Sequence, residues 1–182
     1  GHDMHLVLQN RSINLVYRLE VPFEVVQKEL TLMVANHRDH SMEMLRSTYL
    51  NETYDKIADA LSLQVDGADI SWDTSGPISD KLKKEDRFLV FELHASKKMM
   101  EGARQISILN RNHEGKLSMY RSTIEYEGGF WIDNTDLNNP KQWSKEESMK
   151  ELRMTLRVLP AWLASLEQQW KRILKQEVLF SY

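Results

Sequence analysis

The chain has 182 residues, of which 41% are hydrophobic and 28% are charged, and its formal net charge is -3. This length and balance are typical of one folded globular domain and exclude a disordered chain. The weak negative charge gives no general reason to bind nucleic acid or an anionic membrane surface, and the lack of cysteine excludes disulfides, thiolate metal sites and cysteine nucleophiles.

Neither a membrane span nor a secretory signal is visible in the sequence. No run approaches the roughly 20 apolar residues that a membrane-spanning helix needs, and no basic-then-apolar segment opens the chain. A cysteine-free composition suits a reducing compartment, so we expect a cytoplasmic protein, unless a signal has been removed upstream. Gly1-His2-Asp3 resembles a remnant of cloning, so the sequence predicts one domain over residues 4–182.

The amino-terminal part predicts a hairpin followed by two helices. Residues 5–9 and 13–20 have the composition and partial alternation of strands, joined by the short polar link Asn10-Arg11-Ser12. Pro22 suits the first turn of a helix that runs to about Asn36. Ser41 then suits the N-cap of a second helix, which is expected to break or restart near Asn51.

The middle of the chain predicts a long loop and then a series of strands. Residues 64–86 are rich in turn and charged residues and are expected to be a loop with at most a turn of helix. Residues 88–93, 104–109, 117–126 and 130–132 are expected to be strands. The short links after the second and third of these favour successive hairpins and an antiparallel meander.

The carboxyl-terminal part carries the most regular apolar pattern. Its apolar positions alternate spacings of three and four: Met149, Leu152, Leu156, Leu159, Leu163, Leu166, Trp170 and Ile173. Ser144 and Glu147 form a capping box before it, and Pro160 interrupts it. We therefore expect a long helix, kinked or restarted at Pro160, packed on the chain's own sheet. A coiled-coil or partner-helix surface is the alternative interpretation.

Together these elements predict an α+β fold: an antiparallel meander sheet of about five strands, two N-terminal helices and a long, Pro-interrupted C-terminal helix packed on it. The element order is similar to the helix-grip arrangement, in which a curved sheet wraps a final helix around an apolar cavity. No sequence motif accompanies that similarity, and a fold alone does not determine a function.

Side chains with metal-binding or acid–base chemistry are few and scattered. His37, His40 and Glu43 are ligand types for zinc or iron, although their spacing of three does not bring all of them to one side of a helix. Glu92 and His94 share a strand face and, with Glu125, are candidates for acid–base catalysis. No phosphate-binding loop and no nucleophile motif is present, so an enzyme is the less favoured class.

Three functions are therefore predicted in order of preference. The first is a non-catalytic protein-binding domain of the adaptor, inhibitor, chaperone or effector type, without a cofactor and with a homodimer as one form; its contact residues are Trp72, Trp143, Trp162 and Phe180. The second is a carrier of a small hydrophobic ligand in a helix-grip-like cavity, lined by Met33, Met119, Tyr120, Tyr126, Phe130 and Trp131. The third is a metal-dependent enzyme that uses His37, His40 and Glu43.

Overall fold

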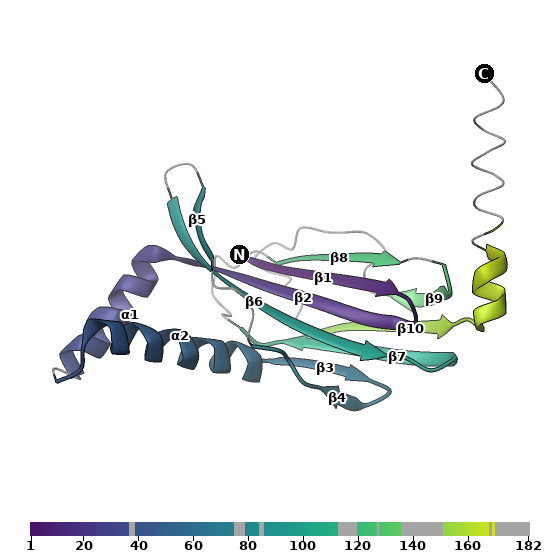
Figure 1. Cartoon of the computed structure of the whole chain (residues 1–182), viewed down its shortest axis with the longest axis horizontal. Coiled ribbons are helices and arrows are strands. Elements are labelled where there is room, and N and C mark those ends of the chain that lie inside the picture. Colours follow the sequence, from purple (N-terminus) through teal and green to yellow (C-terminus); the bar gives the residue numbers. More distant parts are fainter. Residues whose placement is uncertain are drawn as a thin grey trace, which may run out of the picture.

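Two five-stranded sheets and a pair of helices form the body of the molecule (Figure 1). The structure is a computed structural model, and it describes residues 1–36, 39–74, 79–83, 86–112, 120–126, 128–135, 151–167 and 169. The predicted α+β class is confirmed. The predicted single meander sheet is wrong, because the strands divide between two sheets.

Sheet A consists of β1 (His2–Gln9), β2 (Ser12–Pro22), β5 (Ser79–Lys83), β6 (Asp86–Lys98) and β8 (Tyr120–Tyr126), in the order β5-β6-β2-β1-β8. Sheet B consists of β3 (Leu61–Val65), β4 (Ala68–Ile70), β7 (Gly102–Asn110), β9 (Phe130–Thr135) and β10 (Glu151–Val158), in the order β4-β3-β7-β10-β9. The helices are α1 (Phe23–Asn36) and α2 (Met42–Asp59), and residues 161–167 are also helical.

The first hairpin forms where the sequence predicts it, with β1 antiparallel to β2. Its turn residues Asn10 and Arg11 have φ values of 50° and 59°, the left-handed conformations of a type I′ turn, which matches the twist of the strands. The sequence predicts a domain that begins at residue 4, whereas β1 begins at His2. The His2 ring is buried and its Nδ1 shares a 2.6 Å hydrogen bond with the Tyr17 hydroxyl, so this residue is part of sheet A.

The two helices lie together at one end of the sheets (Figure 1). The Ser41 hydroxyl accepts a 3.2 Å hydrogen bond from the Met44 amide, so the predicted N-cap of α2 is confirmed. The predicted break near Asn51 is wrong, because α2 continues to Asp59. Neither α1 nor α2, nor the described turns after residue 160, has the length and hydropathy needed to cross a membrane.

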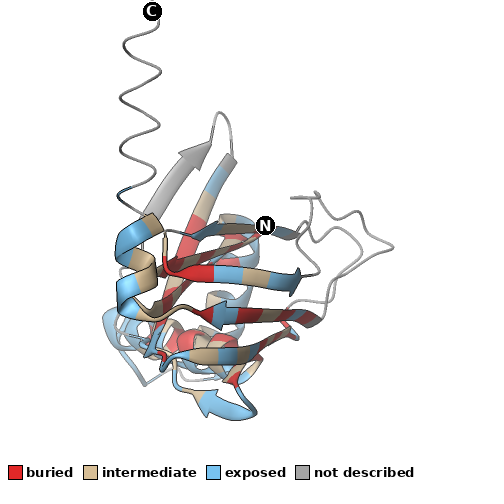
Figure 2. Ribbon diagram, turned by 90° about the vertical axis from the view of Figure 1, so that its right-hand side faces the viewer, coloured by how far each residue is buried: buried red, intermediate tan, exposed pale blue. Residues whose placement is uncertain are grey.

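One hydrophobic core lies between the inner faces of the two sheets. Alternate residues of each strand point inward, such as Leu15, Tyr17 and Leu19 of β2, and Ile106 and Ile108 of β7. Figure 2 shows buried and exposed positions alternating along the strands in this way. The end of α2 closes the core, where the Tyr54 ring meets the edge of the Phe91 ring with centroids 5.2 Å apart.

The segment before Pro160 corrects the strongest prediction from the sequence. Glu151–Val158 is strand β10 rather than a helix, antiparallel to both β7 and β9. Its buried residues alternate strictly: Leu152, Met154, Leu156 and Val158. After Pro160, residues 161–167 are helical, but the element before Pro160 is a strand, so two helices do not meet there. Met149, Trp170 and Ile173 lie outside the described residues, so the predicted long helix is not confirmed there.

Two further corrections concern connections between strands. The region predicted as a long loop, residues 64–86, contains β4 and β5 as well as the end of β3. The Asp66–Gly67 turn that joins β3 to β4 has φ values of 53° and 79° at its two residues, again those of a type I′ turn. The predicted hairpin of β8 and β9 is wrong, because β8 pairs in parallel with β1 and β9 pairs with β10.

Candidate functional site

A tight turn at Gly129 joins the two sheets and supports the helix after Pro160. The turn follows β8 of sheet A and precedes β9 of sheet B. The Leu159 amide donates a 2.8 Å hydrogen bond to the Gly129 carbonyl, and the Gly129 amide donates a 3.3 Å hydrogen bond to Glu167 Oε2. Gly129 has φ +101°, and a Cβ built on it would lie 3.3 Å from the Ala164 Cβ. The helix therefore packs closely on the glycine backbone.

This packing leaves the opposite side of the helix open to solvent. Each helical residue advances about 100° around the axis, so Trp162 and Leu166 point away from the side that carries Ala164. Their exposed fractions are 66% and 44%. The helix stands at the end of the molecule away from α1 and α2 (Figure 1). Trp162, one of the contact residues predicted from the sequence, is thus exposed, and we call Trp162 with Leu166 the apolar helix face.

The other predicted contact residues lie in different settings. The Trp72 side chain is half-buried, packs against the core and donates a 3.2 Å hydrogen bond from Nε1 to the Leu61 carbonyl. That indole therefore has a structural role in holding the loop after β4. Trp143 and Phe180 lie outside the described residues.

The described residues of the predicted ligand cavity do not line one space. Phe130 is buried in the core, and Met33 of α1 packs against the outside of that core. Tyr126 and Trp131, in contrast, are largely exposed. Tyr120 belongs to β8, and its side chain is not among those described. Met119 lies outside the described residues.

The predicted metal ligands are also not assembled within the described part of the chain. His40 and Glu43 are exposed on either side of the N-cap of α2, and His37 is outside the described residues. Over those described residues, no three histidine or carboxylate side chains come close enough together to hold a metal ion.

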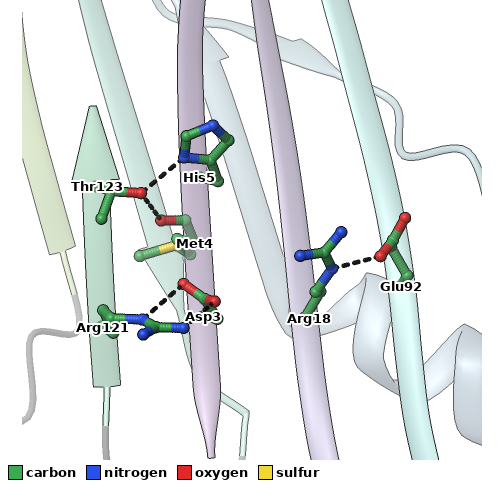
Figure 3. Close-up of polar contacts among 7 residues, drawn as sticks. All are labelled: Asp3, Met4, His5, Arg18, Glu92, Arg121 and Thr123. Atoms are coloured by element: carbon green, nitrogen blue, oxygen red, sulfur yellow. Dashed lines mark hydrogen bonds and ion pairs between the residues drawn. The ribbon is translucent and has the colours of Figure 1, made fainter. Parts of the chain in front are cut away.

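The outer face of sheet A carries a polar network made of residues that lie directly opposite each other on adjacent strands. Asp3 faces Arg121, His5 faces Thr123 and Arg18 faces Glu92. Arg121 Nη2 donates a 2.6 Å hydrogen bond to Asp3 Oδ2, and His5 Nδ1 shares a 2.7 Å hydrogen bond with Thr123 Oγ1 (Figure 3). Figure 3 also shows the ion pair between Arg18 and Glu92. Such cross-strand pairs stabilise sheets.

Glu92 and His94 do come together, as their shared strand face predicts. Glu92 Oε1 lies 2.8 Å from His94 Nε2, and Arg18 binds the other carboxylate oxygen. Burial alone would raise the pKa of Glu92, but the hydrogen bonds from Arg18 and His94 outweigh it and hold the pKa below its usual value. A carboxylate held charged by hydrogen bonds from Arg18 and His94 is a poor proton donor. Glu125, the third candidate, instead lies 3.8 Å from His5 Nε2.

Sequence reasoning missed Arg18, although the register of β2 and β6 could have revealed it once both strands were assigned. Comparisons of the chain with protein-family models, with curated proteins and with solved structures found no match.

Proposed function

We propose that this chain is a non-catalytic protein-binding domain and that the apolar helix face of Trp162 and Leu166 is its contact surface. The observation that carries the proposal is an exposed tryptophan and an exposed leucine one turn apart on a helix whose other side is held by Gly129. A helix that presents anchors four residues apart suits an apolar groove on a partner. Tryptophan is also the residue type most enriched among side chains that dominate binding energy.

The contacts that hold this helix in place contribute to binding as well as its exposed side chains. A segment that is already packed loses less conformational entropy on binding than a free chain. Here the backbone contacts of Gly129 with Leu159 and Glu167 hold the start and the end of the described helix. The partner therefore meets a preformed apolar surface. A cytoplasmic location and a homodimer belong to this proposal as its expected setting and as one form of the partner.

The test is to immobilise the full chain and three variants and to measure which proteins of the host lysate each retains. Trp162→Ala and Leu166→Ala should each lose the same discrete protein. Ser165→Ala, on the same helix, should retain it, and all variants should unfold at the wild-type temperature. Retention of the same protein by Trp162→Ala, or the absence of any retained protein, contradicts the proposal. Sedimentation across a concentration series shows whether the partner is a second copy of this chain.

A further inference from the structure

A polar groove crosses the outer face of sheet B. Its volume is about 480 Å³, and its polar side chains come from four strands: Gln64 of β3, Gln105 and Ser107 of β7, Arg153 and Thr155 of β10, and Asn134 of β9. The inward-pointing neighbours Ile106 and Met154 are buried in the core, so their side chains do not make the groove apolar.

The register of the strands arranges these side chains in rows. Gln105 lies opposite Thr155, and Thr155 lies opposite Asn134. Adjacent strands are about 4.8 Å apart, so this row offers an amide, a hydroxyl and an amide at regular steps. In the next row along the strands, Arg157 lies opposite Trp131, whose exposed fraction is 65%. An exposed indole therefore flanks a row of uncharged polar groups.

The row is not satisfied by its own sheet. Among the described residues, the side chains of Gln105, Thr155 and Asn134 form no hydrogen bond or ion pair. An amide side chain offers both donors and acceptors, and a hydroxyl offers one donor and two lone pairs. The turn at one end of the groove is fixed, because the backbone N–H of Gln105 donates a 2.9 Å hydrogen bond to Asp66 Oδ1 and Arg104 binds the same carboxylate. The backbone beneath these side chains is therefore held in place at this end of the groove.

We infer that this groove is a binding site for an oligosaccharide. Sugar hydroxyls are both donors and acceptors, as the amides and hydroxyl of the row are, and the C–H face of a sugar ring stacks on an indole such as Trp131. A protein partner is less suited, because the centre of a protein interface is apolar and this groove has no exposed apolar side chain at its centre among the residues that line it. A phosphate-rich ligand is less suited as well, since Arg153 is the one cationic side chain in that described lining.

The chemistry assigns a role to each group. The Trp131 ring stacks on one sugar unit at the rim, and the row of Gln105, Thr155 and Asn134 hydrogen-bonds the hydroxyls of the next. Removal of one hydrogen-bonding side chain should weaken binding about fivefold, as expected for a loss of about 1 kcal/mol. Loss of the indole should weaken it more than any of these, because stacking and burial are lost together.

The test titrates the full chain with cellohexaose, maltohexaose, chitohexaose and hexagalacturonate, following the indole fluorescence and the amide NMR shifts. At least one probe should bind with a millimolar or lower Kd and shift residues of β7, β9 and β10. Trp131→Ala should abolish this binding, and Gln105→Ala should weaken it. Asn14→Ala, on the outer face of sheet A, should leave it unchanged. The neutral and acidic probes distinguish a site for hydroxyls alone from one that also uses Arg153.

No binding of any of the four probes overturns the inference, as does equal affinity of the wild type and Trp131→Ala. Loss of the lysate partner in Gln105→Ala or Trp131→Ala, without saccharide binding, would instead make the groove a protein surface. The inference does not depend on the proposed protein-binding function. Trp162→Ala should keep saccharide binding while it loses the protein partner, so the two proposals fail independently.

Discussion

The outer faces of the two sheets are both polar, but they use their polar side chains differently. On sheet A the side chains satisfy one another across the strands, as in the pairs Asp3 with Arg121 and Asn14 with Ser96. On sheet B the row that begins at Gln105 remains open to solvent within the described chain. Polar side chains that pair with one another across the strands stabilise sheet A, whereas those of the Gln105 row have no partner among the described residues of sheet B and stay available to a ligand.

The largest expected effect tests which face of sheet B points outward. Met154 is 2% exposed on the inner face of β10, so Met154→Ala should lower the free energy of unfolding by ~2–5 kcal/mol. Arg157→Ala, on the exposed face of the same strand, should change it by less than ~0.5 kcal/mol. Urea titration measures both. A smaller loss for Met154→Ala than for Arg157→Ala would reverse the assignment of the two faces and remove the basis of the groove.

The same strand shows why the sequence predicts a helix where a strand forms. Leu152 and Leu156 are four residues apart, which places them on one face of a helix and equally on one face of a strand, where every second residue points the same way. The helical pattern then continues through Leu159 and Leu163. Met154 and Val158 complete the alternation that distinguishes a strand, but they are off the helical stripe. Pro160 lies at the boundary between the strand and the helix. The apolar pattern that resembles one long helix therefore belongs to two consecutive elements.

Long-range pairing limits prediction in a second way. The hairpin of β1 and β2 and the N-cap of α2 depend on neighbouring residues and are predictable. The parallel pairing of His5 with Thr123 joins residues that are 118 apart in the chain, and no local pattern specifies it. The exposed Trp162 can be anticipated because it lies off the apolar stripe. The groove cannot be anticipated, because Gln105, Thr155 and Asn134 form a row only when β7, β10 and β9 are adjacent in the sheet.

A stability effect of intermediate size concerns the turn at Gly129, which connects the two sheets. Gly129 connects sheet A to sheet B with φ +101°, and a Cβ would lie 3.3 Å from Ala164. Gly129→Ala should destabilise the fold by ~1–2 kcal/mol through backbone strain, with a further cost from this contact. Gly67, inside sheet B, has φ +79°, and a methyl group added there would meet nothing within 4 Å, so Gly67→Ala should cost only the strain.

Thermal unfolding of both variants measures this difference. Ala164→Gly itself weakens the helix by about 1 kcal/mol, so Gly129→Ala is also measured in the Ala164→Gly background, where it should cost only the strain. If Gly67→Ala is the more harmful substitution, or if Gly129→Ala costs as much in the Ala164→Gly background as in the wild type, then the helix does not pack on Gly129 as described. The apolar helix face would in that case lose its support.

A smaller effect concerns how the stability contributed by the polar network of sheet A depends on pH. The pKa of Glu92 is lower in the folded state than in the unfolded chain, so its charged form stabilises the fold at pH values above the unfolded pKa. This contribution is lost as pH falls through the folded pKa. Arg18 and His94 are 46% and 45% exposed, so Glu92→Gln should cost about 1 kcal/mol or less at neutral pH.

The stability difference between the wild type and Glu92→Gln should therefore shrink on acidification from about pH 5 downward. Urea titrations at a series of pH values measure this difference. Glu125→Gln, at a carboxylate that is 71% exposed, is the matched control for loss of one negative charge. A difference that stays constant or grows as pH falls would show that the charge of Glu92 does not stabilise sheet A.

The smallest effect separates a binding surface from a structural one. Gln105→Ala and Asn134→Ala remove side chains without a partner among the described residues, so each should change the free energy of unfolding by less than ~0.5 kcal/mol. Asn14→Ala removes the acceptor of the 2.8 Å hydrogen bond from Ser96 and should cost about 1 kcal/mol. If the Gln105 and Asn134 variants are as destabilised as Asn14→Ala, the two faces are equivalent. If they are not, the row at Gln105 and Asn134 contributes little to stability, which is what the proposed binding site requires of side chains without a partner on their own sheet.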